Sequence, residues 1–296
     1  MAKHNNFKER FIHGLFLFNG LLVVIVLIGI FTLLIAKSAP VLRDVPLKDF
    51  LLRSTWNPTA TFVAPSYGMG SMIVSTFMVS IGALIIAVPL GIGTAAYLSD
   101  IASPRVREIA KPVIEILAGI PSVVIGFLGI VLVGPALSKL FKLSNGLNAL
   151  NGSILLAVMA LPTIISLAED ALKSVPLSFK EASLALGATH WQTIIKVKIP
   201  AAISGIVAAC MLGMGRAIGE TMTVLMATGC AIAMPRGFLS SVQTITSTIA
   251  IELGEVPYNT THYYALFMIG LVLFVITFII NMASDIILRK YQKVIK

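Results

Sequence analysis

The sequence predicts an all-α integral membrane protein with about six transmembrane helices. Apolar residue types make up 57% of its 296 residues, whereas charged types make up only 12%. Soluble domains carry roughly 25% charged residues. Mean hydropathy is +0.95, and apolar runs long enough to cross a bilayer recur along the chain. Lipid is therefore the expected solvent for most of this protein.

The apolar runs set the predicted spans, because a helix needs roughly 20 apolar residues to cross a bilayer. The first run follows Lys3, Lys8 and Arg10, as a secretory signal would. Its apolar stretch is longer than a cleaved signal usually has, so we expect an uncleaved signal anchor. In chain order, the predicted spans are 13–36, 71–98, 110–135, 151–169, 203–229 and 263–287.

Lys and Arg residues predict the orientation, because cytoplasmic loops carry an excess of them. With the N-terminus inside, the cytoplasmic side holds the larger group: Lys3, Lys8, Arg10, Arg105, Arg107, Lys111, Lys173, Lys180, Lys196, Lys198, Arg289, Lys290, Lys293 and Lys296. The outer side holds Lys37, Arg43, Lys48, Arg53, Lys139, Lys142 and Arg236. Residues 1–12 and 290–296 are then cytoplasmic and 37–70 form an outer loop. The formal charge of +9 flanks apolar runs and does not indicate nucleic-acid binding.

Two long outer segments, 37–70 and 230–262, are large enough to form docking surfaces. The alternative is interfacial padding, with Trp56 as an anchor among the lipid headgroups. In the second segment, apolar and hydroxyl residues recur at helical spacing around 244–249, which predicts a short interfacial helix.

The cytoplasmic segment 173–200 carries the clearest motif. Pro176 suits the first turn of a helix, good helix formers follow it, and Gly187 supplies a stop. A short helix, a glycine turn and a second helix are therefore expected.

Within that segment, Glu181-Ala182-Ser183 is followed after three residues by Gly187 and after nine more by V-K-I-P, ending at Pro200. This spacing resembles the EAA loop of ABC importer permeases. The resemblance implies that Glu181, Ala182, Gly187 and Pro200 belong to a coupling helix that fits a groove on an ATP-binding subunit. It also implies a type I importer transmembrane domain over 71–289. The alternative is an amphipathic surface helix.

The sequence contains no G-x-x-x-x-G-K-[ST] run to hold nucleotide phosphates. Hydrolysis of ATP must then come from a partner subunit, and we expect no catalytic residues, no cofactor and no metal site in this chain. The four histidines are scattered near membrane edges without metal-ligand spacing.

The predicted fifth span contains the charged run G-M-G-R-A-I-G-E-T at 213–221. An ionised side chain at mid-bilayer costs about 3 kcal/mol or more, so Arg216 and Glu220 should face a protein-lined cavity. Four residues apart on a helix, they would share a face, with Thr223 one turn beyond. Either they neutralise each other to hold the bundle, or Arg216 offers its guanidinium to an oxyanion while Glu220 restrains it.

Prolines within the spans add candidate pathway hydroxyls. Pro121 and Pro162 each free a backbone carbonyl, and each is followed by a hydroxyl residue, Ser122 or Thr163. The hydroxyls could line the pathway or satisfy the freed backbone within their own bundle.

The same charged run resembles the signature of phosphate-specific ABC permeases, and three other stretches, 118–127, 246–255 and 265–281, resemble the PstC type of that permease pair. The resemblance implies phosphate import by alternating access at the cytoplasmic (inner) membrane. It implies a PstA-like second permease subunit as heterodimer partner, two PstB-like ATP-binding subunits and an extracytoplasmic PstS-like phosphate-binding protein. The alternatives are a permease for molybdate or sulfate and, more remotely, an ATP-independent anion transporter.

Overall fold

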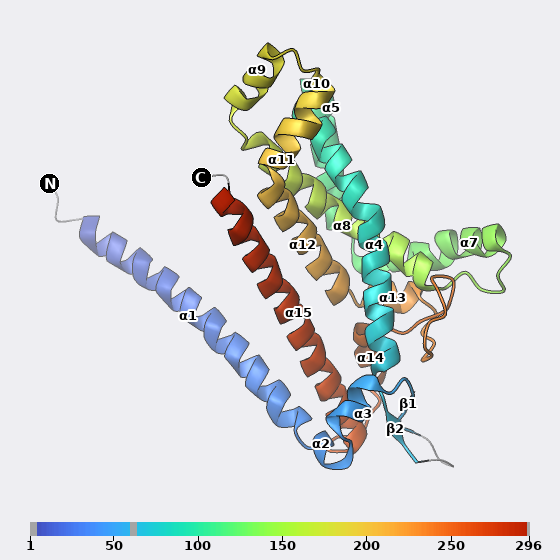
Figure 1. Cartoon of the computed structure of the whole chain (residues 1–296). Coiled ribbons are helices and arrows are strands. Elements are labelled where there is room, and N and C mark those ends of the chain that lie inside the picture. The colour runs from blue at the N-terminus through green and yellow to red at the C-terminus, as the bar shows by residue number, and fades with distance from the viewer. Residues whose placement is uncertain (1–4, 60–63, 295–296) are drawn as a thin grey trace.

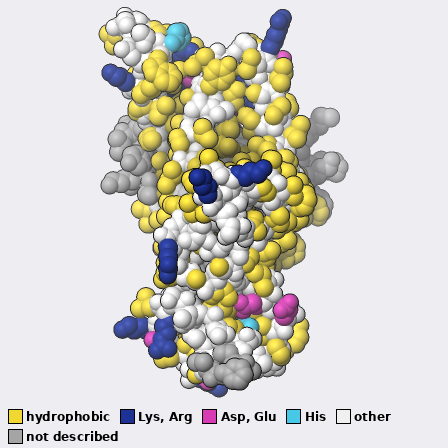
Figure 2. Space-filling view, turned by 90° about the vertical axis from the view of Figure 1, so that its right-hand side faces the viewer, with side chains coloured by type: hydrophobic (Ala, Val, Ile, Leu, Met, Phe, Trp, Pro, Cys, Tyr) yellow, Lys and Arg dark blue, Asp and Glu magenta, His cyan; other side chains and the backbone are white. Residues whose placement is uncertain are grey.

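The computed structural model describes residues 5–59 and 64–294, with side chains over 9–59 and 64–286. It is a bundle of helices, with α1 (Asn5–Ser38) diverging from α15 (Thr261–Val294) toward the N-terminus (Figure 1). Hydrophobic side chains extend along the whole length of the face shown in Figure 2. The predicted all-α membrane fold is confirmed. Expectations for residues 1–4, 60–63 and 295–296 lie outside the described residues.

Within the described residues, five helices are long and apolar enough to cross a membrane, and a sixth arises if a helix pair bent by 73° counts as one span. The bent pair is His190–Ala201 with Ile203–Gly219. The straight candidates are Glu9–Asp44, Gly70–Ile101, Ser122–Phe141, Ala149–Lys173 and Thr261–Ile286.

The predicted third span, 110–135, is wrong because the chain breaks at Pro121. Helix α5 (Pro104–Gly119) ends before Ile120, whose backbone is extended at φ −67° and ψ 127°. A residue before proline is pushed out of the helical region by the proline ring, so the helix stops there. The apolar run instead continues through α6 (Ser122–Leu128), the π-helix η2 (Gly129–Val133) and α7 (Gly134–Phe141).

The predicted fifth span, 203–229, is also interrupted. Helix α12 (Ile203–Gly219) ends where Glu220 turns extended, at φ −70° and ψ 135°. The Thr246 hydroxyl donates to the Glu220 carbonyl at 2.7 Å. A separate helix, α13 (Met222–Ala227), follows.

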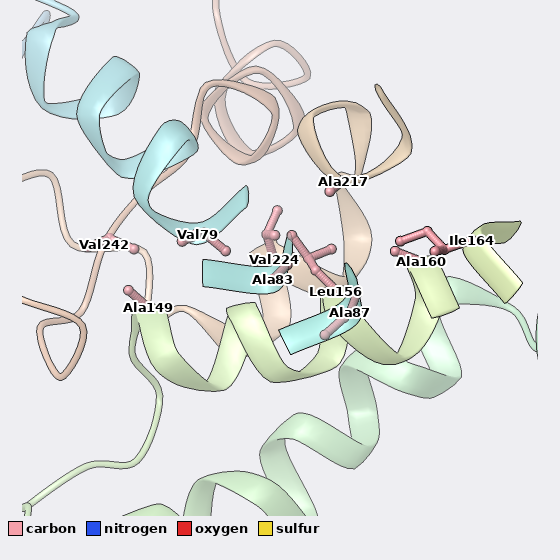
Figure 3. Packing of buried hydrophobic residues seen from close by; sticks show 11 residues of the cluster. Val79, Ala83, Ala87, Ala149, Leu156, Ala160, Ile164, Ala217, Val224 and Val242 are labelled. Atoms are coloured by element: carbon pink, nitrogen blue, oxygen red, sulfur yellow. The ribbon is translucent and has the colours of Figure 1, made fainter. Parts of the chain in front are cut away.

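The core lies where α4 (Gly70–Ala96), α8 (Ala149–Lys173) and α12 pack together. Small residues allow this approach: a Cβ on Gly91 would lie 2.6 Å from Ile164 Cγ2, and one on Gly82 would lie 2.5 Å from Ser153 Oγ. Buried alanines fill the seam between the helices (Figure 3). Close packing of small residues is the usual basis of helix association in membranes.

Residues 37–59 and 64–70, together with α14 (Ile245–Glu252) of the second outer segment, form a cap at the end of the bundle opposite α9 (Leu177–Ala185) (Figure 1). Trp56 is only 4% exposed, and its Nε1 donates to both Glu252 carboxylate oxygens at 3.0 Å. His262 Nε2 lies 2.7 Å from Glu252 Oε2. The anchoring of Trp56 among lipid headgroups is therefore wrong, because its ring is buried inside the protein. The cap comprises α2 (Val41–Asp44), α3 (Leu47–Leu52), the antiparallel strands β1 (Trp56–Asn57) and β2 (Ser66–Tyr67), and α14.

Helix α14 confirms the short helix predicted around 244–249. Its cap, Thr244, accepts from the Ser247 backbone N–H, and the Ser247 hydroxyl accepts from the Thr244 N–H, which forms a capping box. Thr246, Ser247 and Thr248 are buried, so the first turn of the helix is inserted into the protein instead of lying at the interface.

The end of the bundle that carries α9 is built from short elements. The π-helix η1 (Tyr97–Ile101) extends α4. After α9 follow α10 (His190–Thr193), the π-helix η3 (Ile194–Lys198) and α11 (Ile199–Ala201), which leads into α12.

Candidate functional site

Arg216 lies in the last turn of α12, close to the break in the bundle. Its Nη1 is 3.5 Å from the Thr163 hydroxyl of α8. The side chain is exposed on the surface of the single chain. Thr163, which follows Pro162, is one of the two predicted pathway hydroxyls, and the structure places it next to the Arg216 guanidinium.

Glu220, Thr223 and Ser122 meet where α12, α13 and α6 break. The Thr223 backbone N–H donates to Glu220 Oε1 at 3.4 Å. Thr223 is fully buried, and its hydroxyl donates to the Ser122 carbonyl at 3.0 Å. The Thr223 hydroxyl therefore joins α13 to the first residue of α6, and Ser122 takes part in this contact through its carbonyl.

Arg216 and Glu220 do not share a helical face. The helix ends between them, so the i, i+4 geometry expected from their spacing is lost. No ion pair joins these two side chains, both of which lie in the described part of the chain. Mutual neutralisation, the structural alternative for this pair, is absent from this conformation.

Sequence reasoning missed Thr246 as part of this region. Its hydroxyl holds the Glu220 carbonyl, and its helix reaches the break from the outer cap. The available signal was the helical spacing around 244–249, which predicts a helix but not its insertion into the bundle.

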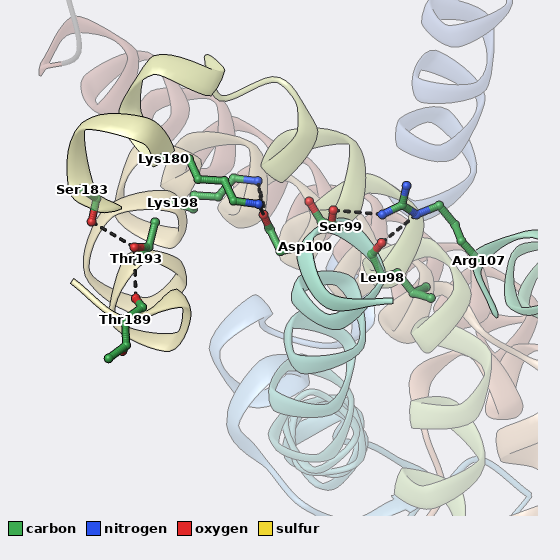
Figure 4. Close-up of polar contacts among 9 residues, drawn as sticks. All are labelled: Leu98, Ser99, Asp100, Arg107, Lys180, Ser183, Thr189, Thr193 and Lys198. Atoms are coloured by element: carbon green, nitrogen blue, oxygen red, sulfur yellow. Dashed lines mark hydrogen bonds and ion pairs between the residues drawn. The ribbon is translucent and has the colours of Figure 1, made fainter. Parts of the chain in front are cut away.

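The segment 173–200 adopts the predicted helix, glycine turn and second helix. Gly187 has φ +83°, a conformation that side chains other than glycine rarely adopt. Thr189 caps α10 in a capping box with Gln192. Ser183 Oγ lies 3.0 Å from Thr193 Oγ1, which joins the two helices (Figure 4).

The outer face of this segment is apolar and open. Leu186 is 90% exposed and Trp191 is 63% exposed. Beside them is a depression of about 580 Å³ lined by Phe179, Ala182 and Gly187, among others. Glu181 is exposed on the same helix, and Pro200 lies within α11, just before the 73° bend into α12.

The inner side of the segment is charged, which the sequence analysis did not anticipate. Asp100 of η1 binds Lys198 Nζ with both carboxylate oxygens at 2.8 Å, and Lys180 Nζ lies 3.5 Å from Asp100 Oδ1 (Figure 4). A second buried carboxylate, Glu169 of α8, pairs with Lys111 at 3.2 Å and with Lys173. The hydrogen bond from Lys111 to Glu169 raises the pKa of that ammonium group.

A spanning bundle with broken helices and one exposed helical loop is the architecture of a membrane transport permease. The chain belongs to the family described as the binding-protein-dependent transport system inner membrane component, whose profile matches residues 87–293. It is 41% identical over 231 residues to the probable ABC transporter permease protein YqgH of Bacillus subtilis, covering 78% of this chain and 74% of the relative.

Further comparisons agree with this family. The chain is 34% identical over 278 residues to the phosphate transport system permease protein PstC 1 of Mycobacterium tuberculosis, covering 82% of each. An inward-facing structure of the MetNI methionine ABC transporter superposes with a TM-score of 0.57 at 22% identity, covering 76% of this chain and 94% of the other. This structural likeness supports the type I importer permease fold.

These findings confirm the resemblance to ABC permeases of the PstC type. The chain is a multi-pass inner-membrane transport component of an ABC system. The family is one of transport permeases, which supports the expectation that this chain is not an enzyme.

Proposed function

We propose that this chain is the permease subunit of an ATP-binding-cassette importer that moves inorganic phosphate across the cytoplasmic membrane by alternating access. The observation that carries the proposal is the exposed Arg216 guanidinium, which lies beside the Thr163 hydroxyl and has no carboxylate partner among the ion pairs of the described side chains. The identity to relatives named phosphate transport system permeases supports the choice of phosphate.

Arg216 is the proposed contact for the phosphate oxyanion. A guanidinium is always charged and presents planar, paired donors that match phosphate oxygens. The face of α12 that exposes Arg216 would line the pathway once a second, PstA-like permease subunit packs against it. Thr163, Ser122 and Thr223 support this site from α8, α6 and α13, and Glu220 keeps the local charge from holding the anion too strongly.

The segment 173–200 is the proposed contact with a PstB-like ATP-binding subunit, of which the heterodimer carries two. Glu181 and Ala182 lie on the exposed helix α9, Gly187 sets its turn, and Pro200 precedes the bend into α12. A helix displaced by ATP binding would therefore tilt α8 and α12, which flank it in the chain.

The proposed orientation puts both termini and the segment 173–200 in the cytoplasm, in line with the excess of Lys and Arg on that side. The cap of α2, α3, β1, β2 and α14 then faces outward, where a PstS-like phosphate-binding protein would deliver its ligand.

The test is ATP-dependent uptake of labelled phosphate into vesicles that contain the reconstituted complex. Arg216→Gln should abolish uptake while the complex still assembles, and Arg216→Lys should retain a fraction of it. Arg105→Gln, which changes an exposed arginine of α5, is the matched control and should transport normally.

Unchanged uptake in Arg216→Gln would discard the anion contact. Uptake of sulfate or molybdate in place of phosphate by the unaltered complex would discard the phosphate assignment and leave the permease class intact.

A further inference from the structure

Asp100 is a buried carboxylate that the transport pathway does not use. Its side chain is 2% exposed, and that of Lys198 is 10% exposed. Both Asp100 oxygens lie 2.8 Å from Lys198 Nζ. A buried charge is retained only when it is paired with good geometry, and removal of one partner leaves the other uncompensated. The ion pair therefore holds η3 in one position relative to η1.

The two lysines that face Asp100 come from different parts of the coupling segment. Lys180 lies on α9, and Lys198 lies at the end of η3. One carboxylate, just beyond the end of α4, thus binds the elements on both sides of the glycine turn, α9 through Lys180 and η3 through Lys198 (Figure 4).

The turn that carries Asp100 is itself restrained from the other side. Arg107 of α5 donates from Nε to the Leu98 carbonyl at 2.8 Å and from Nη2 to the Ser99 carbonyl at 3.0 Å. These bonds satisfy carbonyls at the end of the helix, where backbone acceptors lack partners. Asp100 therefore projects from a rigid turn.

Chain connectivity gives this contact its importance. The coupling segment continues directly into α8 on one side and α12 on the other, but α4 is not joined to it in the chain. Apolar contacts exist as well: α4 packs against α8 and α12 in the core, and Ile194 packs in the same buried cluster as Ala95 and Ala96. Apolar surfaces can slide past one another, whereas separation of a buried ion pair leaves each charge uncompensated.

We propose that Asp100 is a positioning residue of the transport cycle, whose carboxylate ties α9 and η3 to α4 so that α4 moves with the coupling segment when ATP acts. The inference rests on the proposed function. It adds α4 to the helices that ATP moves. The link is an ion pair, because α4 is not adjacent to the coupling segment in the chain.

The test compares Asp100→Asn with Glu169→Gln in the reconstituted complex. Both substitutions neutralise a buried carboxylate that pairs with two lysines, but the partners of Glu169 lie on α5 and α8 instead of α9 and η3. In Asp100→Asn, ATP hydrolysis should persist while phosphate transported per ATP falls about tenfold. Glu169→Gln should keep the ratio of the unaltered complex.

A reversed pair, Asp100→Lys with Lys198→Asp, should recover part of the lost coupling, since it restores an ion pair in the same place. An unchanged transport ratio in Asp100→Asn, or an equal loss in Glu169→Gln, would overturn the proposal.

A second measurement does not depend on the substrate. Spin labels at Gly93→Cys on α4 and Ile279→Cys on α15, in a background with Cys210 and Cys230 replaced by serine, report the position of α4. Both label positions are exposed. The distance between labels should change on ATP binding in the unaltered complex and in Glu169→Gln, but not in Asp100→Asn.

If that distance never changes, or still changes in Asp100→Asn, the tie to α4 is refuted. If it behaves as expected while no phosphate is transported, the proposed substrate fails and the tie stands.

Discussion

Charged side chains are paired at the α9 end of the bundle, whereas in its middle Arg216 has no carboxylate partner among the ion pairs of the described side chains. Near α9, two buried carboxylates, Asp100 and Glu169, are each neutralised by two lysines. In the middle, Arg216 is exposed on the single chain and its contact is a neutral hydroxyl, Thr163. Satisfied charges hold elements together, whereas a charge left without a countercharge is available to a ligand. The difference separates a mechanical region from a binding region.

The largest effect on stability should come from Lys198→Met. It leaves Asp100 buried with only the longer contact to Lys180, and an uncompensated buried charge costs about 3 kcal/mol or more. Thermal unfolding of the purified subunit should show a clear drop in midpoint. Lys173→Met is the matched control and should cost less, because the Lys173 side chain is 37% exposed whereas that of Lys198 is 10% exposed, and ion pairs open to solvent contribute little. Equal losses would contradict the view that burial of the lysine decides the cost.

The next effect should come from Gly187→Val in the coupling turn. The left-handed conformation costs a β-branched residue roughly 1 to 2 kcal/mol or more, so the turn should distort and ATP-driven transport should fall. Gly187→Asn tolerates that conformation better and should retain more transport. Gly237→Ala, at an open position with ordinary backbone angles, is the control. Normal coupling in Gly187→Val would contradict the role of this turn.

A smaller effect is expected for Thr223→Val. The substitution keeps the shape but removes the donor to the Ser122 carbonyl, which costs about 1 to 3 kcal/mol when the acceptor stays buried. Denaturation of the purified subunit measures the loss. Thr261→Val, whose hydroxyl contact with Asp44 is exposed, should change stability much less. If both variants lose the same stability, the packing of α13 on α6 does not depend on this bond.

The smallest effect on stability should come from Glu220→Gln. The amide oxygen can still accept from the Thr223 N–H, so stability should change by no more than about 0.5 kcal/mol. Phosphate affinity should rise, because the negative charge that weakens anion binding at Arg216 is gone. Concentration dependence of uptake measures it, and weaker binding would contradict the proposed role of Glu220.

The sequence predicted most of the helical framework and the coupling motif. Hydropathy finds apolar runs whether or not the backbone is continuous, so the predicted spans 110–135 and 203–229 run through Pro121 and Glu220. The first break was foreseeable from the steric effect of proline on Ile120. The second depends on Thr246, a residue distant in the chain, and no local pattern reveals it.

The sequence predicted which residues form the candidate site but not which of their side chains contact one another. The structure brings Arg216 to Thr163 and Thr223 to Ser122, and it separates Arg216 from Glu220. The sequence does not predict the role of Asp100, because its partner Lys198 lies 98 residues away in the chain. Pairing between remote charges is a tertiary property that spacing along a sequence does not encode.

The outer cap has its own consequence for how such a subunit can move. Trp56 of β1 and His262 of α15 both bind the carboxylate of Glu252 in α14. One acidic group therefore joins a strand to the adjoining ends of two helices. These three elements cannot separate without breaking a partly buried hydrogen bond, so the cap changes position as one unit.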